Sequence, residues 1–216
     1  MDETPVTSTR ATVFFELALG GLGLAVAYAA GFWDPPSLQT VGTPYHTSSI
    51  GAVLLAVLSG LLWTLPMLAL IAILQLLPLK SIRELSSLVD EQLIPMFEGK
   101  DLTALALTAA AAGVGEEILF RWTIQTGFAE GLDTTYAAIW GIAIASVVFG
   151  LMHWLTPAYA VIAKFISVYL GIQLWVTESL LSVIVTHGVY DFLILVYLVK
   201  YRAVRVRQST ETEDTR

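Results

Sequence analysis

The amino-acid sequence predicts an all-α membrane protein, a polytopic bundle of about six transmembrane helices with a polar cavity inside. The chain of 216 residues is 56% hydrophobic and only 13% charged, whereas soluble domains are usually near 25% charged. Its long apolar runs, separated by short polar segments, are each long enough to cross the hydrocarbon core of a bilayer. The chain contains no cysteine, which excludes disulfides and thiolate metal ligands.

The expected spans are bounded by polar or turn-forming residues. Pro66 lies inside the second span, where membrane helices tolerate a kink, and Pro157 follows the fourth. Together the spans form one membrane-embedded domain over 1–216, with its motifs in 102–198 and a polar, disordered tail over about 206–216. The six spans are expected at residues 11–33, 50–77, 102–128, 136–155, 158–176 and 180–201.

The connection from residue 79 to residue 100 is polar, but its apolar residues recur near helical spacing. This pattern is typical of a helix that lies on the membrane surface. An ordinary solvated linker helix fits the same pattern, so both interpretations stand. The residues that carry the pattern are Ile82, Leu85, Leu88, Val89 and Leu93.

Basic residues gather on one side of the expected bundle, which indicates cytoplasmic termini in a multi-pass protein of the cell membrane. The opposite loops, near 34–49, 129–135 and 177–179, contain no Lys or Arg. No basic stripe suggests nucleic acid as a partner, so the expected partners are the lipid bilayer and a membrane-associated peptide or protein. The oligomeric state carries no sequence signal. The basic residues on the one side are Arg10, Lys80, Arg83, Lys100, Lys200, Arg202, Arg205, Arg207 and Arg216.

Three charged residues interrupt the third apolar run, which otherwise contains mainly Ala, Leu, Ile, Val and Phe. Each unpaired charge at mid-depth costs about 2.5–3.5 kcal/mol on insertion scales, or roughly 8–10 kcal/mol for three. Glu117 and Arg121 are one helical turn apart and can neutralise each other. Glu116 points about 100° away from Glu117 and has no local partner. A lone carboxylate that faces a bundle interior predicts a functional site.

Two of the three histidines in the chain lie in later apolar spans. Phe149 and His153 are one turn apart in the fourth span, and His187 and Asp191 are one turn apart in the sixth. A carboxylate with an imidazole can deprotonate a water for attack on a carbonyl. A second imidazole, oriented by Asp191, can donate a hydrogen bond to the developing oxyanion.

At these residues the chain resembles the CAAX protease and bacteriocin-processing family, which includes the type II CAAX prenyl endopeptidases. The family pattern is Glu-Glu-x-x-x-Arg, then Phe-x-x-x-His, then His-x-x-x-Asn or Asp. These motifs occur here in that order at 116–121, 149–153 and 187–191. The resemblance covers about residues 102–198. It implies a glutamate-type intramembrane endopeptidase without a required cofactor, which could process the C-terminus of a prenylated or membrane-associated peptide.

The resemblance also implies roles for the motif residues. Glu116 would activate water with help from His153, while His187 and Asp191 would bind the substrate carbonyl or stabilise the oxyanion. Prenyl-processing members commonly have Asn where this chain has Asp191. Because an ionised aspartate cannot donate a hydrogen bond, Asp191 is better suited to orienting His187. The residues expected to support the site are Glu117, Arg121 and Phe149.

Two other functions fit the same residues. Glu116, His153 and His187 also make a possible zinc-binding set of two histidines and one carboxylate, although the chain has no His-Glu-x-x-His motif. A non-enzymatic membrane protein that binds a peptide or provides immunity would use the same cavity without hydrolysis.

Two expectations concern depth in the membrane. In a strict six-span layout, Glu116 and His187 fall near mid-depth, whereas His153 falls about 10–20 Å away at the cytoplasmic end. Either the fourth helix is displaced inward or a segment near 80–100 or 155–165 re-enters the membrane. Glu16 and Glu178 lie near span ends and are expected to be solvated.

Overall fold

The computed structural model describes residues 8–31 and 50–203, and in these ranges every regular element is helical. The predicted all-α class is confirmed. The expected disordered tail and the first interhelical loop lie outside the described residues. The elements are α1 (Thr9–Ala30), α2 (Ile50–Leu76), α3 (Lys80–Leu88), η1 (Val89–Leu93), α4 (Ile94–Phe97), α5 (Leu102–Glu117), η2 (Ile118–Thr126), α6 (Gly127–Gly131), α7 (Ala137–Met152), α8 (Pro157–Thr177), α9 (Leu180–Val196) and η3 (Tyr197–Arg202), where η marks π-helix.

Five helices of the described chain are long and apolar enough to cross a membrane. The predicted fourth span is instead the 16-residue helix α7, which extends over about 24 Å and is therefore shorter than the ~30 Å hydrocarbon core. The next helix explains this early end. The Thr156 side chain accepts a hydrogen bond from the backbone N–H of Tyr159 at 3.1 Å, and Pro157 begins α8. A threonine N-cap followed by proline starts a new helix and ends the preceding one.

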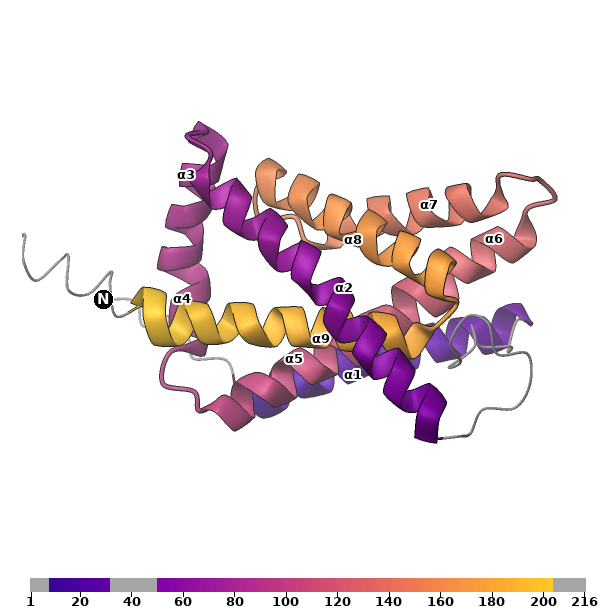
Figure 1. Ribbon diagram of the computed structural model, residues 1–216, viewed down its shortest axis with the longest axis horizontal. Coiled ribbons are helices and arrows are strands. Elements are labelled where there is room, and N and C mark those ends of the chain that lie inside the picture. Colours follow the sequence, from indigo (N-terminus) through magenta and orange to yellow (C-terminus); the bar gives the residue numbers. More distant parts are fainter. Residues whose placement is uncertain (1–7, 32–49, 204–216) are drawn as a thin grey trace, which may run out of the picture.

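The long helices form one bundle around α5 and α9 (Figure 1). α5 and α9 lie side by side, α1 packs along α5, and α2 crosses α9 obliquely. α7 and α8 form an antiparallel hairpin over the other side of the bundle. The segment from α3 to α4 runs across the end of the bundle at which α9 ends.

The distribution of side chains is that of a protein surrounded by lipid. Large apolar side chains are exposed along α1 and α2, whereas the interior contains many small and polar residues. Small residues let membrane helices approach closely, and polar side chains form hydrogen bonds between them. For example, buried Gln173 of α8 donates to Ser182 at 3.0 Å and to Thr186 at 2.8 Å on α9.

Two glycines of α5 set its distance from its neighbours on both sides. A Cβ added at Gly113 would lie 2.9 Å from the backbone nitrogen of Gly188 on α9. A Cβ added at Gly115 would overlap the backbone oxygen of Glu16 on α1. Neither position can carry a side chain unless the helices move apart. The two contacts place α1 and α9 directly against the turn of α5 that carries Glu116.

The segment from residue 80 to residue 97 forms α3, η1 and α4, in agreement with the predicted helix, but its apolar face has a different environment from the one expected. Ile82, Leu85, Leu88, Val89 and Leu93 all line an internal cavity. The segment is held in place at the end of the bundle by Arg202, which donates to Asp90 at 3.0 Å and to the backbone oxygen of Ser86 at 3.3 Å. The segment is therefore a wall of the cavity as well as a connection.

We expect Gly115→Ala to destabilise the protein by about 1–3 kcal/mol or more, because overpacking at a tight contact forces the backbone to shift. Gly21→Ala is the matched control, since nothing lies within 4 Å of a Cβ at that position. The free energy of unfolding in mixed detergent micelles, followed by circular dichroism, measures the difference. Equal stability of the two variants would contradict the α1–α5 contact.

Candidate active site

The predicted residues from three separate helices lie together. Glu116 is at the end of α5, His153 directly follows α7, and His187 and Asp191 are on α9. One oxygen of Glu116 lies 3.9 Å from Nε2 of His153, and its other oxygen lies 3.9 Å from Nε2 of His187. Glu116 is buried, with 8% of its surface exposed. The arrangement is one carboxylate between two imidazoles.

The short α7 explains how His153 reaches this position. The helix ends at Met152, and the chain turns at His153 toward α8, with the Leu155 N–H donating to the His153 oxygen at 2.9 Å. A helix of full span would carry this histidine past Glu116 to the membrane surface. The early end of α7 therefore keeps His153 beside Glu116.

Glu117 and Arg121 form the ion pair that the sequence predicted, at 3.1 Å between Glu117 Oε2 and Arg121 Nε. Both side chains are completely buried. Arg121 also donates to the backbone oxygen of Ser167 on α8 at 3.2 Å. The other oxygen of Glu117 lies 2.6 Å from Nδ1 of His187. Sequence reasoning missed this last contact, because the spacing of residues 117 and 187 does not indicate that they meet.

His187 is oriented by carboxylates on both sides of its ring. Nδ1 faces Glu117, and Nε2 lies 3.3 Å from Asp191 Oδ2. An ionised carboxylate only accepts hydrogen bonds, so a ring with a proton on both nitrogens can donate to both. Asp191 is thus in the position expected of a residue that orients His187.

His153 is held by Phe149, one turn before it. Its Nδ1 lies 2.9 Å from the Phe149 backbone oxygen, and the two rings stack with centroids 4.2 Å apart at 13°. Because a carbonyl oxygen only accepts, Nδ1 carries the proton, and in the neutral ring Nε2 has a free lone pair. That lone pair is on the nitrogen nearest Glu116. Phe149 is also fixed from behind by Phe120, with ring centroids 4.8 Å apart.

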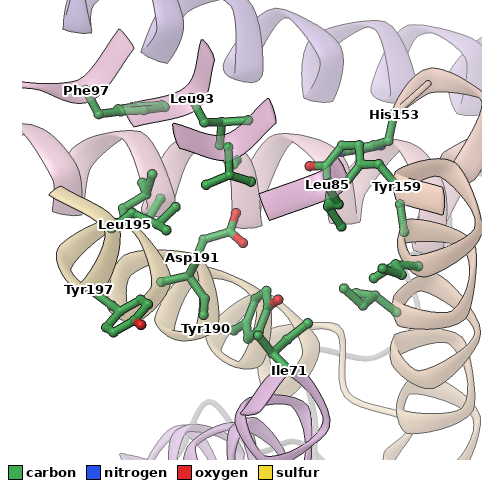
Figure 2. A pocket seen from close by; sticks show the side chains of 18 of the residues that line it. Ile71, Leu85, Leu93, Phe97, His153, Tyr159, Tyr190, Asp191, Leu195 and Tyr197 are labelled. Atoms are coloured by element: carbon green, nitrogen blue, oxygen red, sulfur yellow. The ribbon is translucent and has the colours of Figure 1, made fainter. Parts of the chain in front are cut away.

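Glu116, His153, His187 and Asp191 line a cavity of about 380 Å³. Figure 2 shows His153 on one side of this cavity, apolar side chains on the other side, and Asp191 extending from α9 between them. The polar groups of the cavity are therefore set among apolar walls. Apolar side chains labelled in the view include Leu93, Phe97 and Leu195.

Glu16 corrects one sequence-based expectation. It does not lie with the solvated residues at a span end. It lines the same cavity as Glu116, and its Oε2 atom is buried. In the sequence, the one indication of this position was that Glu16 is a carboxylate inside the apolar run that forms α1. That Glu16 faces the cavity follows from the contact of α1 with α5 at Gly115, which the sequence does not specify.

The zinc alternative requires Glu116, His153 and His187 to act as ligands of one metal ion. Within residues 8–31 and 50–203, no group of three His, Cys, Asp or Glu side chains is arranged to hold a metal ion. The described side chains therefore offer no assembled metal centre.

A family model described as type II CAAX prenyl endopeptidase Rce1-like matches residues 98–193. Over these residues the chain is similar to that family. The match includes all three motifs and confirms the resemblance that they predicted. The Rce1-like family implies a membrane endopeptidase, and the apolar helices indicate a multi-pass membrane protein. No curated protein and no solved structure matches the chain.

We expect Arg121→Met in this Rce1-like segment to cost about 3–5 kcal/mol of stability, because it leaves the buried Glu117 carboxylate without its guanidinium partner. The double variant Glu117→Leu/Arg121→Met should cost less than the single one, since it leaves neither member of the pair buried alone and His187 keeps Asp191 as a partner. Unfolding in mixed micelles measures both. A double variant less stable than Arg121→Met would contradict the pairing.

Proposed function

We propose that the chain is an intramembrane endopeptidase in which Glu116 is the general base that activates water. The observation that carries the proposal is the position of the buried Glu116 carboxylate, 3.9 Å from each of two imidazole Nε2 atoms at the wall of a cavity. The Rce1-like match supports the membrane endopeptidase activity in general.

The gap between Glu116 and His153 suits a bridging water. A separation of 3.9 Å is too long for a direct hydrogen bond, and contacts of this length are commonly bridged by water. The Glu116 carboxylate and the free lone pair of His153 both accept. A water that donates one hydrogen to each directs its own lone pairs away from them, toward a carbonyl carbon in the cavity.

His187 is suited to the opposite task. With Nδ1 of a doubly protonated ring on Glu117, its Nε2–H faces the cavity and Asp191 at 3.3 Å. This N–H can turn from Asp191 to an oxyanion that forms in the cavity. A donor fixed in place before the reaction stabilises the oxyanion of a tetrahedral intermediate. Asp191 would orient this ring and would not donate to the oxyanion itself.

Peptide hydrolysis in this site would proceed in two steps, with Glu116 carrying the proton between them. The water oxygen bonds to the carbonyl carbon while Glu116 accepts a proton, and the carbonyl oxygen becomes an oxyanion near His187. Glu116 then transfers that proton to the amide nitrogen, the C–N bond breaks, and a carboxylic acid and an amine leave. Glu116 returns to its ionised form, so no cofactor is consumed.

The cavity supports a membrane-associated peptide as the substrate, prenylated or not. Its apolar walls offer space for a lipid-like or apolar group beside the polar residues (Figure 2). We also propose that the end of the bundle holding Lys100 and Lys200 faces the cytoplasm of a cell membrane. The two residues lie together, because Lys200 Nζ donates to the Lys100 oxygen at 3.0 Å, and clustered basic residues stay on the cytoplasmic side.

We expect Glu116→Gln and His153→Ala to fold normally and to lose peptide cleavage by at least about a hundredfold, the usual contribution of a general base. Glu130→Gln, which removes an exposed carboxylate on α6, is the matched control and should keep full activity. Cleavage of a quenched peptide by purified protein in bilayer nanodiscs measures the rates. Retained cleavage in either of the first two variants would refute the mechanism.

We expect cleavage to survive strong chelation, because the proposed base, oxyanion donor and proton carrier are all side chains of this chain. The measurement is peptide cleavage before and after dialysis against a chelator, with the metal content of the same sample determined by mass spectrometry. Loss of activity with stoichiometric metal, restored by zinc, would support the zinc alternative. Peptide binding with no cleavage in any sample would support the non-enzymatic alternative.

A further inference from the structure

Glu16 of α1 is a carboxylate that the proposed mechanism does not use. It lines the same cavity as Glu116 and Asp191, and its Oε2 atom is buried with no hydrogen-bond partner among the described residues. The backbone of Glu16 packs on Gly115, the residue before Glu116. The side chain is therefore held beside the reaction site by the helix crossing itself.

Other charged side chains near the cavity already have partners in the described part of the chain. Glu117 is neutralised by Arg121. Arg202 is the one Lys or Arg side chain among the described residues that line the cavity, and it is bound to Asp90 through two of its nitrogens. Neither cation is available to a further carboxylate.

The carboxylates that remain outnumber the positive charge that can face them. His187 with both nitrogens protonated supplies one positive charge, and it lies within 3.9 Å of both Glu116 and Asp191. His153 has a proton on Nδ1 directed at a carbonyl oxygen. Glu16 also faces His187, so Glu16, Glu116 and Asp191 share the one positive charge of that ring. Carboxylates in excess of the positive charge are costly in a site of low dielectric constant.

A second observation at the same cavity also indicates a cationic ligand. Glu116 is buried at 8% exposure, and its Oε2 atom, like that of Glu16, has no hydrogen-bond partner among residues 8–31 and 50–203. Two carboxylate oxygens from different helices thus face one cavity without a hydrogen bond, although His187 Nε2 lies 3.9 Å from the Glu116 oxygen. Because no described group of three ligands is arranged for a metal ion, an organic cation suits the site better.

We propose that Glu16 forms a subsite for a lysine or arginine side chain of the substrate, next to the bond that Glu116 hydrolyses. The inference rests on the proposed function and names its substrate class. Lysine and arginine combine an apolar stem with a charged head, and the cavity pairs apolar walls with carboxylates. Glu16 is accordingly a specificity-determining residue and takes no part in the proton transfers.

The experiment compares quenched apolar peptides that differ only in having Lys, Gln or Glu at one position, scanned along both sides of the scissile bond. We expect the purified full chain to prefer Lys over Gln by at least about tenfold in kcat/KM at one position, and Glu16→Gln to reduce that preference to within about threefold. Glu130→Gln, the same charge change at an exposed site of α6, should keep the wild-type preference.

A binding measurement makes the test independent of cleavage. Labelled Lys and Gln peptides are titrated with the Glu116→Gln variant and with Glu16→Gln/Glu116→Gln, and anisotropy is recorded. We expect tighter binding of the Lys peptide to the first variant and equal binding of both peptides to the second. We expect n-butylammonium to compete with the Lys peptide for binding. Such competition would show that the site recognises the charged head of the lysine side chain itself.

Each outcome is decisive. Wild-type cleavage without a Lys preference, or a preference that Glu16→Gln keeps, overturns the subsite while the endopeptidase proposal stands. No wild-type cleavage of any peptide, combined with Glu16-dependent binding of the Lys peptide, overturns the endopeptidase proposal and keeps the subsite. Neither cleavage nor preferential binding overturns both. The wild-type comparison of Lys and Gln peptides needs no variant, so a misfolded Glu16→Gln would not prevent a decision.

Discussion

The structure depends on the close approach of α5 to α1 on one side and to α9 on the other. Gly113 and Gly115 leave no space for a side chain at these crossings. Lipid tails are as apolar as the helix surfaces, so association within a membrane relies on such close packing and on polar contacts. Here both occur at one turn of α5. The same crossings bring Glu16, Glu116, Glu117 and His187 within one small volume.

That volume concentrates charge that a membrane protein would otherwise avoid. The Glu117–Arg121 pair is fully buried, and burying two charges is repaid only when the geometry and additional hydrogen bonds are good. Arg121 meets a backbone oxygen of α8, and Glu117 meets His187 of α9. The pair thus ties α5 to two other helices and fixes the imidazole next to Glu116. One ion pair serves both the bundle and the site.

Much of this was accessible from the sequence, and the remainder depended on tertiary contacts. Charges inside an apolar run must find partners, so Glu116, Glu117, Arg121 and the two histidines could be predicted to converge. The spacing of four residues, about one helical turn, predicted the Glu117–Arg121 ion pair directly. The period carries no information on which helices touch, so the contact of Glu117 with His187 and the place of Glu16 in the cavity were missed. The expected fourth span, 136–155, ended correctly before Pro157 but included residues 153–155, which form the turn between α7 and α8.

The shortness of α7 has a consequence for the surrounding lipid. A helix of 16 residues falls short of the hydrocarbon thickness by about 6 Å, and a bilayer adjusts to such hydrophobic mismatch by thinning around the short element. Headgroups and their hydration then descend along this flank toward residues 153–156. In a bilayer thinned in this way, water would reach the interior from the side of the bundle, and the site would respond to the thickness of the membrane in which the protein resides.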